Sequence, residues 1–202
     1  MNPAIPIATA AALALAASSS RRGSAQLDPD TVARFKAAAG ELIRASSASR
    51  PDFDLSGGEG LNHARELWRG LGMGDEPLDL SGVNLSEANL AGAELAGVNL
   101  SGATLVNAYL MDANLRGANL SGANLGRAGL NYANLREANL KGAKLQYAHL
   151  NRADLTGANL TGANLWHAEV QGTDLTGANL RKDEVREALY DATTVWPQGF
   201  KP

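Results

Sequence analysis

The chain has 202 residues, no cysteine and a formal net charge of −3 at pH 7. This charge argues against a strongly basic nucleic-acid-binding protein, and the missing cysteine excludes a disulfide framework and thiolate metal sites. Hydrophobic residues make up 45% of the chain but aromatic residues only 5%, so alanine and leucine must build most of the core.

The first segment, residues 1–27, contains no acidic side chain, and its apolar run from Ile5 to Ala17 precedes Arg21 and Arg22. That run has 13 residues and is too short to cross a bilayer as a helix. A secretory signal would carry positive charge before the apolar run, although the sequence Ala-Leu-Ala within it offers a cleavage motif. The composition fits an organelle transit peptide better, and a disordered tail is the alternative. A transit peptide would place the protein in an organelle, a plastid or its thylakoid lumen; secreted, periplasmic and cytoplasmic locations are the alternatives.

Residues 28–77 predict a small helical N-terminal cap. Asp28 and Pro29 have the character of an N-cap and a first helical residue, and apolar side chains then recur on one face: Val32, Phe35, Ala39, Leu42 and Ile43. A second helix is predicted from Leu61 to Leu71, ended by Gly72. The loop between them contains FDLSG at 53–57, which matches LDLSG at 78–82. This match is either a lone first pentad or a coincidence.

The central segment, 78–182, repeats with a period of five residues. Leucine occupies position 80 and every fifth position to 180, with Val170 as the only exception, so 21 pentads follow without a break. Alanine stands two positions before most of these leucines, as Ala118 does before Leu120. In extended backbone both side chains point inward and the residue between them, usually Asn or Asp, points outward. An odd period keeps every leucine inside only if the chain bends once per pentad, and the outward Asn or Asp suits such a turn.

The last residue of each pentad shows that four bends make one coil. Glycine returns there at every fourth pentad, at positions 82, 102, 122, 142 and 162, and never in the following series, at positions 87, 107, 127, 147 and 167. This phase predicts a coil of four sides and 20 residues. Glycine corners suit turns with positive φ, and the other corners are predicted to use a different turn type.

These pentads, written ANLSG, ANLRG and ANLTG, resemble the pentapeptide-repeat family with its A(D/N)LXX motif. The resemblance implies an all-β fold, a right-handed quadrilateral β-helix of about five coils, here with a small α-helical N-terminal cap. Residues 183–202 resemble the family's C-terminal cap. Large residues keep the register of five at Val185, Tyr190, Val195 and Phe200, and Trp196-Pro197 suits the covering of the last apolar layer.

Three classes of function compete. The first is a non-catalytic scaffold or protein-interaction module with an unknown protein partner, no nucleic acid, no integral membrane segment, no cofactor, and a monomeric or weakly dimeric state. The second, known within the family for acidic dimers, is a topoisomerase-directed DNA mimic; eight acidic and eight basic residues between 78 and 182 disfavour it. The third is an enzyme or a metal-binding accessory protein. The chain has no cysteine nucleophile, no HExxH motif and no phosphate loop before a helix, so no catalytic residue is expected.

The outward residues are not uniform around the coil. The side of Leu100, Leu120, Leu140 and Leu160 carries small polar residues and glycine, whereas the next two sides carry nearly all the bulky groups. Because aromatic and arginine side chains concentrate at interfaces, these residues are candidates for partner binding. The candidates are Tyr109, Arg127, Tyr132, Lys144, Tyr147, His149, Arg152, Trp166 and His167. The alternative is that turns of the non-glycine type merely tolerate large side chains.

A three-residue metal site is the sharpest local hypothesis. His149 and Glu169 are 20 residues apart and should stack on adjacent coils, as Tyr147 should over His167. His149, His167 and Glu169 together could hold a zinc ion with water as the fourth ligand. If the corner directs His167 elsewhere, only an exposed His–Glu pair of little energetic weight remains.

Overall fold

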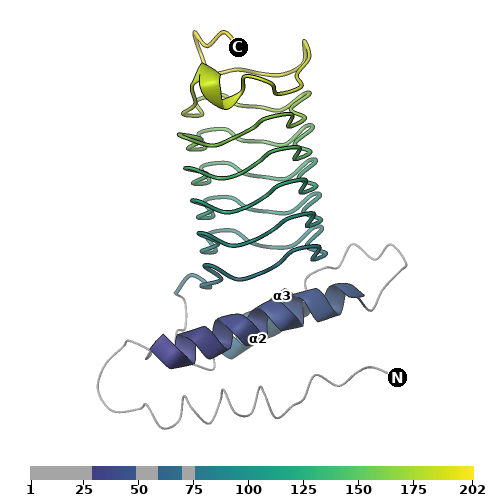
Figure 1. Cartoon of the computed structure of the whole chain (residues 1–202), viewed down its shortest axis with the longest axis vertical. Coiled ribbons are helices and arrows are strands. Elements are labelled where there is room, and N and C mark those ends of the chain that lie inside the picture. Colours follow the sequence, from purple (N-terminus) through teal and green to yellow (C-terminus); the bar gives the residue numbers. More distant parts are fainter. Residues whose placement is uncertain (1–28, 49–58, 70–75) are drawn as a thin grey trace.

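The computed structural model describes residues 29–48, 59–69 and 76–202. Figure 1 shows a rod of stacked coils standing on two helices, with the C-terminal segment at the far end. The expectations for residues 1–27 and for a first pentad at 53–57 lie outside the described residues. Among the helices that the structure describes, none combines the length and apolar composition that a bilayer crossing demands.

The coil length predicted from the sequence is confirmed by the backbone pairing. Parallel bridges join residues 20 apart, and five of them in succession lead from Asp79 to Asn179. Three further series run parallel to this one, so each coil has four sides. On each side the amide of a leucine such as Leu80 donates to the carbonyl one coil up, that of Asn99, at 2.8 Å. The amide of Asn99 donates back to Leu78 at 3.0 Å. Short stretches of hydrogen bonding between successive coils therefore take the place of the long paired strands of an ordinary sheet.

One turn geometry serves all the corners, which corrects the expectation of two types. Each turn from Leu80 to Leu175 is closed by a hydrogen bond to the carbonyl three residues back, such as Val83 N to Leu80 O at 3.2 Å. The residue before the closing amide has positive φ whether it is Gly82, with φ 70°, or Tyr147, with φ 60°. Nine of these corners are not glycine: Glu87, Asn107, Asp112, Arg127, Tyr132, Glu137, Tyr147, Arg152 and His167. Backbone hydrogen bonds to the coils above and below hold these nine residues in a conformation that residues other than glycine disfavour.

The interior is as uniform as the corners. The repeat leucines from Leu80 to Leu175, with Val170, are essentially inaccessible to solvent, and so are the alanines two positions before them. Thr173 is buried at one such alanine position and donates its hydroxyl to the carbonyl of Leu150 at 2.7 Å. The core is therefore a stack of leucine layers sealed by small side chains.

Two helices cover the first coil. Helix α2 (Pro29–Ala48) begins at the predicted proline, and α3 (Glu59–Trp68) begins slightly before the predicted Leu61. The two helices pack against each other, and α2 lies across the base of the rod in Figure 1. Buried side chains of both helices, including Phe35, Ile43 and Leu61, join the apolar core of the coils. The helices therefore bury an end that would otherwise expose unpaired backbone and leucine.

Polar contacts fix α2 to the edge of the first coil. Lys36 pairs with the carboxylate of Asp79 at 2.9 Å and donates to the hydroxyl of Ser81 at 2.6 Å. The Arg44 guanidinium donates to the backbone carbonyl of Asn84, which faces away from the second coil. The helix thus supplies donors where no further coil can.

At the other end, a buried carboxylate replaces a backbone carbonyl as the acceptor of a hydrogen bond between coils. The 3₁₀ turn η2 (Lys182–Glu184) interrupts the series of bridges, and the Glu184 side chain is only 3% exposed. Its carboxylate accepts the backbone amides of Gly162 and Arg181. In the coil below, the corresponding amide of Gly142 donates to a backbone carbonyl, that of Thr161. A side chain therefore completes the ladder where the backbone departs from it.

The C-terminal cap covers the last layer and keeps the predicted register as far as Tyr190, because Glu169 bridges Leu189, but loses it at Val195. Val185 is buried, but Tyr190 and Val195 are about half exposed. Asp174 bridges Val195 rather than residue 194, because one extra residue precedes this last side. The shift turns Val195 outward and Trp196 inward, against the core. Trp196 stacks on Phe200 at 5.3 Å between ring centroids, and both side chains are partly buried against the core, as expected of residues that cover the last apolar layer.

Candidate partner-binding side

The side of the rod that carries Asn99, called here the plain side, is a regular polar ladder. Each side chain in the column Asp79, Asn99, Asn119, Asn139, Asn159 accepts a hydrogen bond from the backbone amide two residues on. Each asparagine of the column also donates to the side chain one coil below, at distances from 3.0 to 3.5 Å. All five corners that follow these residues are glycine. Every turn on the plain side therefore has a side-chain acceptor for its free amide, and no corner of this side places a non-glycine residue at positive φ.

The side two corners further along is different, and is called here the aromatic side. Its outward column is Asn89, Tyr109, Gly129, His149, Glu169, joined by successive parallel bridges. Seven outward positions between 79 and 174 are neither Asn nor Asp, and four of these follow one another in this column. Most turns on this side therefore lack the side-chain acceptor that the plain side repeats.

The corner leading to this side, the Arg127 corner, carries a stack of large groups: Glu87, Asn107, Arg127, Tyr147, His167. The Arg127 guanidinium lies over the Tyr147 ring at 5.7 Å from its centroid, and Tyr147 stacks on His167 at 5.4 Å. Trp166 contacts both rings, edge-on to Tyr147 at 5.1 Å and tilted against His167 at 4.2 Å. Tyr147 and Trp166 remain 41% and 44% exposed. A cation and three rings therefore form one solvent-facing cluster.

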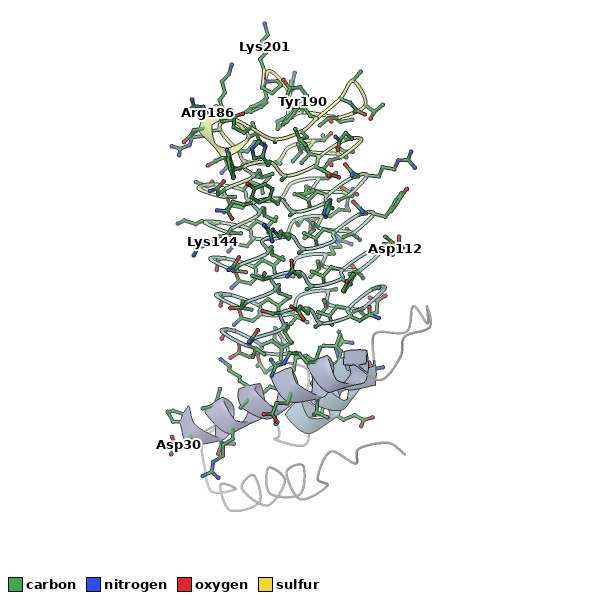
Figure 2. The ribbon with its side chains drawn as sticks, turned by 45° about the vertical axis from the view of Figure 1, so that its right-hand side comes forward. Asp30, Asp112, Lys144, Arg186, Tyr190 and Lys201 are labelled. Atoms are coloured by element: carbon green, nitrogen blue, oxygen red, sulfur yellow. The ribbon has the colours of Figure 1, made fainter. Side chains whose placement is uncertain are left out.

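A second, smaller group lies at the corner on the other edge of the aromatic side. Arg152 donates to the Tyr132 hydroxyl at 3.0 Å and its guanidinium also lies over that ring at 5.7 Å. Asp112 belongs to the same corner, and Figure 2 shows it projecting outward from the rod. The two corners thus bound the Tyr109 column with aromatic and charged groups.

The predicted contact between His149 and Glu169 is present, whereas the three-residue metal site is not. His149 Nδ1 donates to Glu169 Oε2 at 3.1 Å, and Asn151 Nδ2 donates to the same oxygen at 2.8 Å. The hydrogen bond from His149, followed by that from Asn151, lowers the pKa of the Glu169 carboxyl, although burial acts in the opposite direction. His167 instead lies among Tyr147 and Trp166. No three His, Cys, Asp or Glu side chains in the described part of the chain are grouped to hold a metal ion.

A notch opens beside the Arg127 corner, with a volume of about 510 Å³. Its walls come from the Tyr109 column and the corner: Glu87, Asn107, Ala108, Tyr109, Arg127, Gly129 and His149. Tyr109 is 63% exposed at its edge. The Tyr109 and His149 side chains belong to coils separated by one coil, and the outward position of that middle coil in their column is Gly129, which has no side chain.

The structure therefore places the nine candidate residues in distinct groups. Arg127, Tyr147, Trp166 and His167 form the corner cluster; Tyr132 and Arg152 pair at the next corner; Tyr109 and His149 border the notch. Lys144 lies on the neighbouring side, in the column of Asn124 and Asn164, and projects from the rod in Figure 2.

The candidate list missed two residues that shape this surface. Gly129 stands where an outward Asn or Asp is usual, and that break in the repeat is visible in the sequence. Asn151 donates to Glu169 and accepts the Gln171 amide at 3.1 Å. The position just after the leucine holds residues as different as Ser86 and Trp166 in the repeat, and no motif marks Asn151.

Comparisons with known proteins agree with this architecture. The family model for pentapeptide repeats matches in eight copies, over residues 79–117, 108–146, 118–157 and 158–182. No curated protein sequence gives a significant match to the chain.

Among solved structures, the chain is similar to HetL, a pentapeptide repeat protein involved in heterocyst differentiation regulation from the cyanobacterium Nostoc. The identity is 28% over 63% of this chain and 73% of HetL, with a TM-score of 0.35. It is also similar to a pentapeptide repeat protein of the Arabidopsis thaliana thylakoid lumen, at 32% identity over 57% of this chain and 77% of that one, with a TM-score of 0.36. QnrB1, a plasmid-mediated fluoroquinolone resistance protein, is similar at 20% identity over 56% and 61%, with a TM-score of 0.37. Because the family model matches more than half of the 202 residues, the chain belongs to the pentapeptide-repeat family.

Proposed function

We propose that the protein is a non-catalytic scaffold, a right-handed quadrilateral rod that presents its aromatic side to a protein partner. The observation that carries this proposal is the exposed cluster of Arg127, Tyr147, Trp166 and His167. Tryptophan, tyrosine and arginine are the side chains that most often dominate the binding energy of interfaces. Here they are held in stacked positions by a rigid backbone, so little conformational entropy is lost on binding.

Backbone strain at the Arg127 corner also supports the proposal that this surface binds a partner. A non-glycine residue in the left-handed region costs on the order of 1 kcal/mol, and less for Asn and Asp. Arg127, Tyr147 and His167 adopt that region, at φ 58°, 60° and 53°, although glycine serves all five corners of the plain side. Stability alone would favour glycine at these corners as well. Such strain is typical of positions retained for binding.

The charge distribution disfavours a topoisomerase-directed DNA mimic. A mimic needs acidic side chains that stand unneutralised like phosphates. Here Asp79 pairs with Lys36, Glu137 with Arg116 at 3.5 Å, and Asp154 with Arg136 at 3.1 Å.

The location proposed for this scaffold is an organelle, on the composition of residues 1–27. The N-terminus of the mature chain, mapped by mass spectrometry, tests that location. A chain that starts at Met1 in the cell would exclude a cleaved transit peptide.

Affinity capture of the full chain from its own cells tests the interaction. The aromatic-side variant combines Tyr147→Ala with Trp166→Ala, and the matched control combines Lys141→Ala with Thr161→Ala on the plain side. Each interface aromatic is worth roughly 2 kcal/mol, or about 30-fold in affinity, so the aromatic-side variant should lose the captured protein. Its Tm should stay close to that of the wild type, because both side chains are outside the core.

The control makes the result specific. The plain-side variant should capture the same protein in the same amount as the wild type. Equal capture by the aromatic-side variant, or equal loss by both variants, would contradict the proposal.

A further inference from the structure

Gly129 leaves a gap in an otherwise continuous column of side chains. It bridges Tyr109 below and His149 above, and it stands where Asn occupies the plain side in four consecutive coils. An Asn there would accept a hydrogen bond from the amide two residues on, as Asn119 does from Ser121 at 3.2 Å. Gly129 has no side chain and cannot accept that hydrogen bond.

The backbone does not require glycine at this position. Gly129 is outside the set of corners with positive φ. A Cβ added to it would find only the carbonyl oxygen of Ala108, at 4.0 Å, which is ordinary contact. Glycine also loses more conformational entropy on folding than any residue with a side chain. Glycine at position 129 therefore lowers the stability of the protein, and it leaves open space beside the backbone.

That open space is the notch, and its dimensions follow from the coil spacing. Neighbouring coils in a β-ladder are about 4.8 Å apart, so Tyr109 and His149 are separated by about 9.6 Å along the rod. A planar ring inserted between them would lie about 4.8 Å from each, within the range in which aromatic rings interact. A branched aliphatic side chain has neither a flat face nor a polar edge to present to the two rings.

The charges around the notch favour a neutral occupant. Glu87 and Arg127 line the same wall and carry opposite charges. His149 already donates to the Glu169 carboxylate. An anionic ligand would meet Glu87, and a cationic ligand would meet Arg127, whereas a phenol hydroxyl can accept from Arg127 without either conflict.

We propose that the notch receives a neutral aromatic side chain, most suitably a tyrosine, from the partner protein. This inference rests on the proposed function, since it places one anchor of the partner on the aromatic side. The ring occupies the level of Gly129 between Tyr109 and His149, and its hydroxyl accepts a hydrogen bond from Arg127. The column of side chains is thereby completed by the other protein.

The test uses N-acetyl-tyrosinamide as the probe and NMR of the full chain as the measurement. A probe of this size should bind with roughly millimolar affinity. It should shift the ring signals of Tyr109 and His149, while N-acetyl-leucinamide at the same concentration should not.

Gly129→Asn is the decisive variant because it fills the gap with the side chain that the repeat favours. It should weaken probe binding at least tenfold and raise Tm by about 2–4 °C through the regained hydrogen bond. Thr104→Asn is the matched control, since it adds the same side chain at an outward position that does not line the notch. It should bind the probe as the wild type does.

The outcomes separate this inference from the proposed function. If the probe shifts no signal of Tyr109 or His149, or shifts them equally in Gly129→Asn, the notch is not an aromatic site. If Gly129→Asn still captures the partner while the Tyr147, Trp166 variant does not, the aromatic side binds its partner without using the notch. Loss of capture by both variants, with unchanged capture by Thr104→Asn, supports both.

Discussion

The plain side and the aromatic side are built on the same backbone and the same leucine layers, yet their outer surfaces differ. On the plain side the column of Asn99 satisfies every turn, and each corner after it is glycine. On the aromatic side the column of Tyr109 departs from this pattern, and the corner of Arg127 contains no glycine at all. Identical scaffolding thus carries one surface suited to stability and another suited to contact.

This difference separates what the repeat requires from what it allows. Inward positions admit almost only leucine and alanine, because each layer repeats the one below it. Outward positions tolerate rings, charges and even positive φ at Tyr147, because the ladders on both sides hold the corner. Stability is spread over the whole rod, and a binding surface can therefore vary on one side without unfolding it.

The largest expected effect tests whether the two sides share one interior. Leu120→Ala lies beneath the plain side and Leu130→Ala beneath the aromatic side, and both leucines are fully buried. Each substitution should lower the free energy of unfolding by about 2–5 kcal/mol, because the alanine-lined core cannot close the cavity. Urea denaturation of both variants measures the two losses. A loss at one position several times that at the other would show that the sides differ inside as well as outside.

A smaller effect should distinguish the outer columns. Asn119→Ala removes the acceptor of Ser121, the donor to Asn99 and the acceptor of Asn139, so it should cost about 1–2 kcal/mol. His149→Ala removes one contact between two partly exposed groups and should cost less than about 1 kcal/mol. Thermal unfolding of the two variants side by side gives the comparison. A larger loss for His149→Ala would mean that the aromatic side also stabilises the rod.

Strain at the corners should be measurable at a position away from the Arg127 corner. Glu137 has φ 59° in a corner series whose other members are glycine, and it forms only an exposed ion pair with Arg116 at 3.5 Å. Glu137→Gly should therefore stabilise the protein by about 0.5–1 kcal/mol, or about 1–4 °C in Tm. Gly117→Glu, at φ 64°, should produce the opposite change. If neither variant moves Tm, the left-handed corners are not strained.

Much of this architecture could be predicted from the sequence, because the repeat constrains it. The period of five fixed which residues face inward, and the return of glycine every fourth pentad indicated the 20-residue coil that the bridges show. The start of α2 at Pro29 and the contacts of His149 with Glu169 and Tyr147 with His167 were also predicted correctly.

The failures occur where tertiary context overrides a local preference. A different turn type at Tyr147 was expected because large residues avoid positive φ, yet pairing with the coils on both sides imposes it. The predicted inward position of Val195 was wrong because the chain contains one extra residue just before it. The metal site failed because the corner carries His167 towards Trp166. The role of Glu184 had no signal, since a carboxylate that replaces a backbone carbonyl is not marked by any spacing.

The smallest expected effect concerns the pH dependence of the aromatic side. Hydrogen bonds from His149 and then Asn151 hold the pKa of Glu169 below its usual value, although burial opposes them. The folded protein therefore binds a proton at Glu169 less readily than the unfolded chain does.

The resulting stabilisation is present in full above the ordinary glutamate pKa of about 4.3, and it is lost as the pH falls through the lower folded-state value. Because the side chain is 35% exposed, solvent screening should limit this contribution to roughly 0.5 kcal/mol or less. Glu169→Gln should therefore lower Tm by that small amount above about pH 5, and its Tm should converge with that of the wild type as the pH falls to about 3, so that the decline towards low pH is flatter. Asn159→Ala on the plain side, which removes no ionisable group, should lower Tm equally at every pH. If Glu169→Gln instead steepens the decline towards low pH, the carboxylate is not stabilised by its two donors, and the aromatic side owes nothing to that contact.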